Sequence, residues 1–356
     1  MMSSEIHLGP SNGVSCPLPI SDHTEIVLAH GSGGRLSHQL IQNLVLPHFG
    51  NDLLDPLNDG AIFSVNGGKL AFTTDSFVVN PIFFPGGDIG KLAICGTVND
   101  LAMCGAKPLY LSAGFILEEG LDMEDFRRII LSMKRTACEA GVLLVTGDTK
   151  VVDRGKADKI FINTSGIGSV DPGVSVDPRR AQVGDKIIIN GPIAMHGIAI
   201  MSVRENLAFE TEIASDCAVL NGLTSALIAA CPDVHVLRDP TRGGIASALN
   251  EIAEQAKVGI HLDEASIPIS EDVKAACEIL GFDPLYVANE GKLLAIVPPE
   301  RASHALDALR CHPLGREASA IGEVVADHPG FLTMRTKVGG NRVVDMLSGE
   351  QLPRIC

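Results

Sequence analysis

A stretch rich in proline, glycine and aspartate divides the sequence into two parts that each carry their own strands and helices. It runs from Asp171 to Arg180, DPGVSVDPRR, and this composition is typical of a break between folded units. A chain of 356 residues is also too long for one ordinary hydrophobic core. We therefore expect two domains, at 25–175 and 176–335, with a disordered leader at 1–24 and a flexible tail at 336–356.

Strands and helices follow one another along both parts without a fixed alternation. The first part predicts helices over 88–106 and 123–140, and strands over 70–79, 109–117, 142–145 and 160–170. The second part predicts strands over 185–191, 292–298 and 320–325, and helices within 196–207, 217–231, 244–258 and 271–281. Because the order is not strictly β–α–β, it favours an α+β fold over a doubly wound sheet.

The charge of the chain argues against nucleic-acid binding. The formal net charge of −15 repels phosphate backbones, and no run of Lys and Arg offsets it. The first basic side chain is Arg35, which argues against a signal peptide, and no apolar run approaches the roughly 18 residues of a membrane span. Nine cysteines without a CxxC pair indicate a reducing environment, so we expect a cytoplasmic protein.

The last four residues are Pro353, Arg354, Ile355 and Cys356. A thiol at the tip of a mobile tail is poorly placed for packing, but it can move between sites. This position suits an arm that carries a covalent group. Arg354 would lower the pKa of the thiol, whereas a neighbouring carboxylate would raise it, and the sequence leaves the net direction open.

Four aspartates are expected in or beside glycine-rich turns: Asp59 in NDGA, Asp75 in TTDS, Asp100 in VNDLA and Asp148 in TGDTK. Magnesium takes carboxylate oxygens and is normally shared with substrate phosphates, so this set suits nucleotide binding. Each aspartate alone is more often a helix cap or a turn residue. The four together favour the metal site.

Three glycine loops precede expected helices, GSGG at 31–34, PGGDIG at 85–90 and TRGG at 241–244. Backbone N–H groups at such helix starts hold phosphate oxygens. None of the loops matches the P-loop or the dinucleotide-binding pattern, so another type of phosphate site is expected.

Several single residues have both a chemical and a structural interpretation. Lys150 suits phosphate binding or proton transfer, but equally a surface ion pair, and Glu290 in ANEGK is a general base or a solvated turn residue. His30 and His196 have no partner evident in the sequence. A histidine satisfied by hydrogen bonds is the favoured interpretation of both.

The motifs together resemble the HypE family of hydrogenase maturation proteins. The resemblance runs from about Glu25 to Cys356 and rests on the segments TTDSFVVNPIFFPGGDIGKLAICGTVNDLAMCGAKPLYLS, TGDTKVV, GPIAMHGIAIMSVRE, DPTRGGIASALNE, ANEGK and PRIC. VNDLA, GAKPL and HGIA are also similar to aminoimidazole ribonucleotide synthetase, selenophosphate synthetase and thiamine-monophosphate kinase.

This resemblance implies a two-domain fold of mixed or antiparallel sheets covered by helices, which forms a homodimer through its N-terminal domain and binds Mg-ATP near that interface. It also implies that Cys356 accepts a carbamoyl group from the carbamoyltransferase HypF. ATP-driven dehydration then gives a protein thiocyanate, whose cyano group passes to the HypC–HypD scaffold that carries the iron of the hydrogenase.

The resemblance assigns roles to individual residues. It implies magnesium ligands at Asp59, Asp75, Asp100 and Asp148, and proton transfer or positioning by Lys150 and Glu290 beside the reactive Cys356. The implied nucleotide contacts are Asp88, Asn99, Asp100, Asp148, Thr149, Lys150, Arg242 and Gly243.

Two other functions are compatible with parts of the sequence. One is an ATP-dependent kinase or synthetase that acts on a free small molecule, with Cys356 incidental. The other is a binding module whose tail thiol carries a metal, which is disfavoured because a lone cysteine is a weak metal site.

Overall fold

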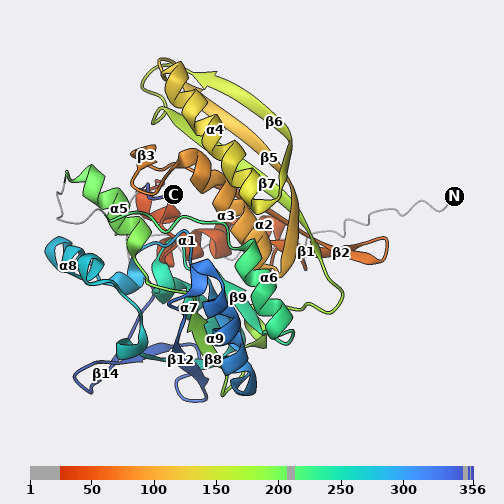
Figure 1. Cartoon of the computed structure of the whole chain (residues 1–356), viewed down its shortest axis with the longest axis vertical. Coiled ribbons are helices and arrows are strands. Elements are labelled where there is room, and N and C mark those ends of the chain that lie inside the picture. The colour runs from red at the N-terminus through yellow and green to blue at the C-terminus, as the bar shows by residue number, and fades with distance from the viewer. Residues whose placement is uncertain (1–24, 207–212, 348–351, 353) are drawn as a thin grey trace, which may run out of the picture.

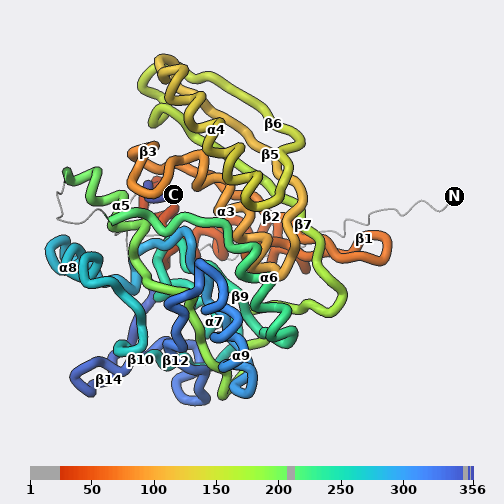
Figure 2. The backbone as a smooth tube through the Cα atoms, viewed as in Figure 1, coloured from red at the N-terminus to blue at the C-terminus, as the bar shows by residue number. Residues whose placement is uncertain are grey.

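The computed structural model describes residues 25–206, 213–347, 352 and 354–356, so the expected leader at 1–24 lies outside the described residues. Figure 1 shows two sheets with their helices, one above the other, and the end of the chain between them. The trace in Figure 2 places this end beside β3 (Phe83–Phe84) and α5 (Met195–Arg204). Of the helices in the described ranges, none is long and apolar enough to cross a membrane.

The first domain contains a five-stranded sheet in the order β1-β2-β7-β5-β6. Its strands are β1 (Ala61–Val65), β2 (Gly68–Phe77), β7 (Ile160–Val170), β5 (Ala106–Glu118) and β6 (Leu143–Val152). All neighbours are antiparallel except β5 and β6, which are parallel. Buried and more exposed residues alternate along β7, which is typical of a sheet covered on one face only.

Helices α3 (Ile89–Met103) and α4 (Met123–Ala140) cover one face of this sheet (Figure 1). The side chain of Asp122 caps α4 by accepting from two backbone N–H groups, and Gly141 ends it in the left-handed conformation. Ile129 and Met133 of α4 are buried, whereas α3 is buried on nearly all sides. The first domain therefore has its core between the sheet and α3, with α4 as the outer layer.

The opposite face of the five-stranded sheet is bare. Phe72, Ile167 and Tyr110 lie opposite one another across β2, β7 and β5, and their exposed fractions are 42%, 38% and 47%. Leu143 continues this row on β6 and is 64% exposed. We call this surface the bare face; so many apolar side chains in one surface favour burial against a partner.

The second domain contains a seven-stranded sheet in the order β14-β13-β10-β12-β8-β11-β9. The strands are β8 (Lys186–Ile189), β9 (Val236–Arg238), β10 (Gly259–Asp263), β11 (Leu294–Val297), β12 (Ser319–Val325), β13 (Leu332–Arg335) and β14 (Asn341–Val343). Only β10 and β13 are parallel, so both sheets are mixed, as the resemblance implies.

This sheet is covered on both faces, which explains the unbroken run of isoleucines in β8. Ile187 and Ile189 contact the cluster formed with α7 (Gly244–Ala256) and α8 (Glu271–Leu280). Ile188 contacts the cluster formed with α6 (Asn221–Ala230) and α9 (Ala302–Cys311). Short helices α1 (Arg35–Leu40) and α2 (Leu46–Phe49) precede the first sheet, and β3 pairs with β4 (Gly87–Asp88).

The α+β prediction is confirmed, and α4 begins and ends where the sequence predicts. Helix α9 and strands β1, β9, β10, β13 and β14 were not predicted. Residues 341–343, within the segment expected to be a tail, form β14. The domain boundaries otherwise stay a prediction.

The prediction that TGDTK forms a glycine-rich turn is wrong, because Asp148 lies in the middle of β6. Gly147 is explained by strand pairing, since a Cβ atom there would collide with the carbonyl oxygen of Ala113 on β5. The glycine allows the two parallel strands to approach.

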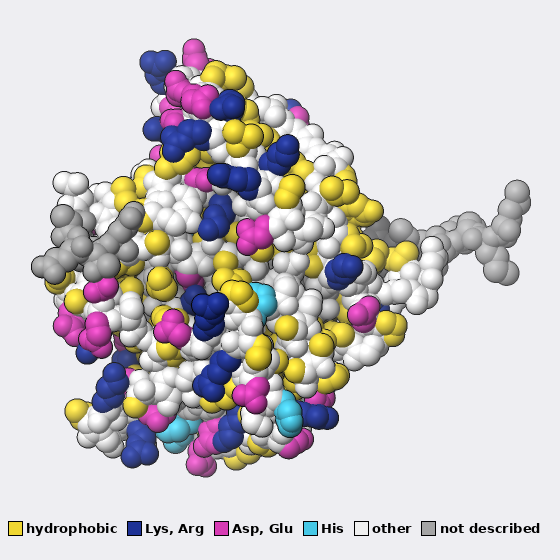
Figure 3. Space-filling model, viewed as in Figure 1, with side chains coloured by type: hydrophobic (Ala, Val, Ile, Leu, Met, Phe, Trp, Pro, Cys, Tyr) yellow, Lys and Arg dark blue, Asp and Glu magenta, His cyan; other side chains and the backbone are white. Residues whose placement is uncertain are grey.

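On the face shown in Figure 3, Lys and Arg side chains are interspersed with Asp and Glu over both domains. This face therefore offers no continuous basic patch for a phosphate backbone.

The contact between α3 and α4 gives a test of the fold. A Cβ atom on Gly90 would lie 2.6 Å from the carbonyl oxygen of Ile129 and 2.8 Å from the Cγ of Met133. We expect Gly90→Val to lower the free energy of unfolding by about 1–3 kcal/mol in urea denaturation, because α4 must shift. Gly173→Val is the control, because a Cβ there meets no atom within 4 Å; an equal loss in both variants would contradict the packing described.

Candidate active site

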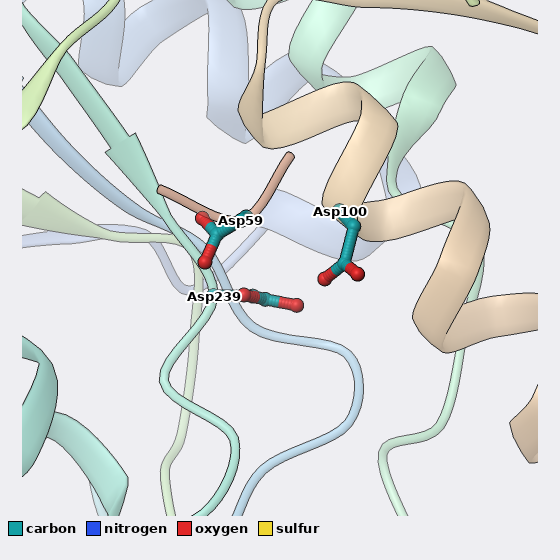
Figure 4. Close-up of side chains that lie close together, drawn as sticks. All are labelled: Asp59, Asp100 and Asp239. Atoms are coloured by element: carbon teal, nitrogen blue, oxygen red, sulfur yellow. The ribbon is translucent and has the colours of Figure 1, made fainter. Parts of the chain in front are cut away.

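Three carboxylates from separate segments meet where the two domains face each other. Asp59 precedes β1, Asp100 lies on α3 and Asp239 follows β9. One ligand atom of each lies within 4.8 Å of the others, and Figure 4 shows the three side chains directed toward one another. Thr73 on β2 donates a hydrogen bond of 2.8 Å to Asp100. We call these three residues the acidic cluster.

Burial makes the negative charge of the acidic cluster costly. It raises the pKa of Asp59 to about 8 and that of Asp239 to about 6, and it raises the pKa of Asp100 well above its usual value. Arg238 opposes these shifts, because its guanidinium lies 2.7 Å from Asp59 and 2.7 Å from Glu251. A divalent cation would remove the remaining excess of negative charge.

A cavity of about 870 Å³ lies against the acidic cluster and is lined by Asp59, Asp239 and Arg242. Two of the three glycine loops meet there. Gly33 of GSGG lies against Arg242 of TRGG, so that a Cβ on Gly33 would be 2.8 Å from the Cβ of Arg242. Phe72 on the bare face of β2 also lines the cavity, which therefore reaches the bare face.

Three buried side-chain atoms in the cavity wall lack a hydrogen-bond partner among the described residues: Asn58 Oδ1, Ser247 Oγ and Gln255 Oε1. Buried polar atoms are normally paired, so unpaired ones at a cavity indicate a polar ligand. Carboxylates, an arginine and glycine loops around one cavity suit a nucleotide with its cation.

Arg242, which lines this cavity, also lies close enough to Cys356 for their charges to interact. The backbone N–H of Val78 donates to the main-chain oxygen of Cys356 at 3.1 Å, so the end of the chain runs beside the end of β2. Burial raises the pKa of the Cys356 thiol above its usual range, while the nearby Arg242 opposes the shift. The ionised form of this thiol would in turn be the main cause that raises the pKa of Arg242. Arg242 thus connects the cavity with the thiol.

Glu290 lies beside the thiol, within hydrogen-bonding reach of it. Its side chain is buried, and Oε1 lacks a protein partner in the part of the chain that the structure describes. Burial raises the pKa of Glu290 well above its usual value. Asp216 holds the loop by accepting from the backbone N–H groups of Glu290 and Gly291 at 3.3 and 3.2 Å, and Lys292 lies 3.3 Å from Asp216.

Asn99 and Asp88, two expected nucleotide contacts, are already engaged by the protein. The side chain of Asn99 donates to the carbonyl oxygens of Ala218 at 3.1 Å and Glu290 at 3.5 Å, and it accepts from the N–H of Leu220 at 2.8 Å. Asp88 caps α3 by accepting from two of its first N–H groups. Asp88 thus stabilises the start of α3, and Asn99 connects α3 with the loop of Glu290.

Asp148, Thr149 and Lys150 lie on β6, away from the acidic cluster. Strand pairing places Asp148 opposite Gly114 and Lys150 opposite Ile116, so both side chains belong to the bare face, whereas Thr149 faces the other side. Lys150 and Asp148 form an exposed ion pair of 2.6 Å, which lowers the pKa of Asp148. Within one copy of the chain, these residues are separate from the acidic cluster.

The remaining candidates lie around the cavity and the thiol. Asp75 lies close to both Arg242 and Asp100: Arg242 acts to lower the pKa of Asp75, and Asp75 acts to raise the pKa of Asp100. Gly243 has a left-handed φ of 75° and faces Ser247. His30 lines the cavity and accepts from the N–H of Val27. His196 is satisfied by hydrogen bonds, as predicted.

Sequence reasoning missed Asp239 and Asp216. Asp239 lies in the DPTRGG motif, three residues before Arg242, so the motif carried the signal. Asp216 lies in SDCA and contacts the Glu290 loop only through tertiary packing, so no local pattern could have indicated it.

Two family models match the chain, the N-terminal domain of AIR synthase related protein over residues 57–170 and its C-terminal domain over 182–335. The carbamoyl dehydratase HypE of Azotobacter vinelandii is 55% identical over 93% of this chain and 97% of its own length. The carbamoyl dehydratase HypE of Cupriavidus necator is 54% identical over the full length of both proteins.

Two solved structures are also similar. One is a HypE–HypF complex, with 48% identity, a TM-score of 0.83 and coverage of 86% of this chain and 99% of the matched chain. The other is the hydrogenase maturation protein HypE in complex with ATP, with 52% identity, a TM-score of 0.79 and coverage of 93% and 100%.

The pKa values of the acidic cluster predict a pH-dependent response to magnesium. Since the folded-state pKa values of Asp59 and Asp239 are raised from 3.8 to about 8 and about 6, the metal-free protein loses stability as the pH rises through this range. Magnesium binds the ionised carboxylates, so we expect the Mg²⁺-induced rise in Tm to be larger at about pH 8 than at about pH 6. Thermal denaturation with and without Mg²⁺ measures both effects.

Asp100→Asn should reduce this response, whereas Asp148→Asn on the bare face is the matched control and should retain it. A Mg²⁺ response that is the same at both pH values, or that is lost only in Asp148→Asn, would contradict the assignment of the acidic cluster.

Proposed function

Because the chain belongs to the AIR synthase related family, and within it to the HypE carbamoyl dehydratases, we propose that it dehydrates a carbamoyl group carried on the thiol of Cys356 to a thiocyanate at the expense of ATP. The product supplies the cyanide ligands for the iron of [NiFe]-hydrogenase. The main support from the structure is the location of Cys356 beside Glu290 and Arg242, next to the acidic cluster and its cavity.

In this proposal HypF delivers the carbamoyl group. A relative of this chain has been solved in complex with HypF. The partly buried thiol has a raised pKa and is therefore a poor nucleophile while it lies in this site. The tail must consequently leave its site to receive the carbamoyl group, and it then returns with the group attached.

The carbamoyl oxygen is a poor leaving group until it is phosphorylated. ATP transfers its terminal phosphoryl group to this oxygen, the nitrogen loses both protons, and the oxygen departs with phosphate. The atoms then balance as S-carbamoyl-cysteine plus ATP giving S-cyano-cysteine, ADP and phosphate. Arg242 both lines the cavity proposed for the nucleotide and interacts with the thiol, which supports a role for Arg242 in binding the transferred phosphoryl group.

Magnesium fits the acidic cluster, because Asp59, Asp100 and Asp239 offer oxygen ligands close together in a site where their charges are poorly solvated. Asp75 lies close to this cluster and is the next candidate ligand. The cation would neutralise the charge of the phosphates. The role expected for Asp148 is not supported within one copy of the chain.

Glu290 is the candidate base that removes an N–H proton. Its unpaired Oε1 can accept a hydrogen bond from the carbamoyl nitrogen, and its raised pKa makes the ionised form a stronger base. Asp216 and Asn99 hold its backbone and so fix the position from which it acts.

We further propose that two copies pair through the bare face. The apolar row of Phe72, Ile167, Tyr110 and Leu143 would be buried in such a homodimer. The cavity reaches this face through Phe72. The pairing would place Asp148 and Lys150 of each copy at the interface near a nucleotide, which is how Lys150 would contribute to phosphate binding or proton transfer.

The thiocyanate then passes to the HypC–HypD scaffold in this proposal. The chemistry needs a free thiol, and the structure describes eight cysteines, all without disulfides, which suits the cytoplasm. The rival kinase acting on a free small molecule gives no reason for a thiol held between Glu290 and Arg242.

The separate roles of Glu290 and Cys356 predict different reaction intermediates. With HypF and its substrates, Glu290→Gln should still acquire the carbamoyl group, but ATP-driven loss of water should slow about 10²–10⁴-fold because no base is present. Cys356→Ser should form neither species and retain ATP binding. Intact mass before and after ATP, with calorimetry for ATP binding, measures these steps; normal water loss in Glu290→Gln would remove it from the mechanism.

The proposed dimer predicts that charge on the bare face separates the copies. Ile167→Glu would bury a carboxylate in the middle of the interface, so we expect the dimer dissociation constant to rise about tenfold or more. Light scattering with size-exclusion chromatography measures it. Val338→Glu is the control, because Val338 is 94% exposed in the hairpin between β13 and β14; a monomeric wild-type protein, or an unchanged Ile167→Glu dimer, would refute the proposed interface.

A further inference from the structure

Helix α5 and the segment after β2 both bind the backbone of the last residues. The N–H groups of Val78 and Asn80, which follow β2, donate to the main-chain oxygens of Cys356 and Arg354 at 3.1 and 3.2 Å. From α5, His196 Nε2 lies 2.8 Å from the carbonyl oxygen of Ile355, and Arg204 donates to the carbonyl oxygen of Arg354 at 2.8 Å. The main-chain oxygens of three consecutive residues are thus bound.

The side chains of the tail add two anchors. Ile355 is 3% exposed and packs in the core cluster that includes Ile82, Ile200 and Ala288. Arg354 forms an ion pair of 2.5 Å with Asp158. The binding site for the tail is therefore a slot between α5 and the segment after β2, and the side chain of His196 in it has no exposed surface.

The hydrogen bonds around His196 fit only one tautomer of its neutral ring. A carbonyl oxygen can only accept, so Nε2 carries the proton donated to Ile355. In the neutral ring Nδ1 is then an acceptor, so Ser215 Oγ, 2.8 Å away, donates to Nδ1 while it accepts from the N–H of Cys217 at 3.0 Å. The neutral imidazole is fixed by a chain from Cys217 through Ser215 and His196 to the tail.

Other contacts fix the ring in place. The ring of Phe84 meets the imidazole edge-on, with 5.5 Å between the centroids. The N–H of Ser215 donates to the carbonyl oxygen of Pro85 at 2.8 Å, which ties the Ser215 segment to the PGGDIG loop. Burial also lowers the pKa of His196, which favours the neutral ring.

We propose that His196 is the positioning residue that holds Ile355, and with it the thiol of Cys356, in the reaction site. The inference rests on the proposed function only in that this thiol is the reacting group. His196 does not touch the thiol or the nucleotide. Its hydrogen bond sets the fraction of time that the tail occupies the slot, and Ser215 acts by fixing the tautomer that can donate.

The test measures how readily the thiol leaves the slot in the full-length protein. Pulses of iodoacetamide followed by peptide mapping give the alkylation rate of each cysteine. Cys138 and Cys311 are exposed and provide internal references. We expect His196→Ala to raise the rate at Cys356 about five- to tenfold, because one buried hydrogen bond is lost, with no change at the two reference cysteines.

Two matched variants distinguish positioning from general destabilisation. His196→Gln retains an N–H donor and should restore a rate within about twofold of the wild type. His235→Ala removes another buried histidine of the same domain, which bonds to Asp185 and lies away from the tail, and should leave Cys356 unchanged. If His196→Ala does not fold, Ser215→Ala provides the same test, because the correct tautomer is no longer fixed.

An unchanged rate at Cys356 in His196→Ala, an equal rise in His235→Ala, or no rescue by His196→Gln would overturn the proposal. In turnover assays His196→Ala should lower kcat for water loss and leave KM for ATP unchanged. If the wild-type protein shows no water loss, the proposed function fails, whereas the alkylation rates still decide whether His196 holds the tail.

Discussion

The arrangement of the two domains depends on the nearly complete burial of helix α3. Of its 15 residues 13 are buried, because the five-stranded sheet and α4 cover one side and the second domain covers the other. The polar groups inside this contact are paired: Thr97 bonds to Thr164, and Asn99 bonds to three backbone groups of the second domain. Since an unpaired buried amide is costly, these bonds fix how the domains meet. The next residue, Asp100, is thereby presented to the acidic cluster.

Burial where the two domains meet removes water from the acidic groups and the thiol of the site and so shifts their pKa values. The carboxyl groups of Asp59, Asp100, Asp239 and Glu290 and the thiol of Cys356 all have pKa values raised by burial. Two arginines, Arg238 and Arg242, offset only part of this charge. A site with such an excess of buried negative charge attracts a cation and destabilises ionised groups until a ligand enters. The same burial that joins the domains therefore suits the site to a nucleotide and the proposed metal, and it disfavours the thiolate of the resting Cys356.

The sequence predicted those features that short patterns encode. Helix α4 was predictable because its apolar spacing is bounded by Asp122 and Gly141, which cap it. The common site expected for Asp100 and Cys356 stays a prediction. The pairing of β5 with β6 decides that Asp148 points from the bare face, and no local pattern contains that pairing. Likewise Asn99 looks like a ligand residue in VNDLA, yet the second domain, distant in sequence, uses all of its hydrogen-bonding groups.

The slot binds main-chain oxygens of the tail together with the side chains of Ile355 and Arg354, and the slot and the tail belong to one chain. The local concentration of the tail near the slot is therefore set by the short connection from β14 and not by the amount of protein in the cell. Under this condition a few weak hydrogen bonds suffice to keep the slot filled, so the intrinsic affinity can remain low. Low intrinsic affinity means rapid dissociation, and a carrier that must visit another enzyme in every cycle benefits from an anchor that releases quickly.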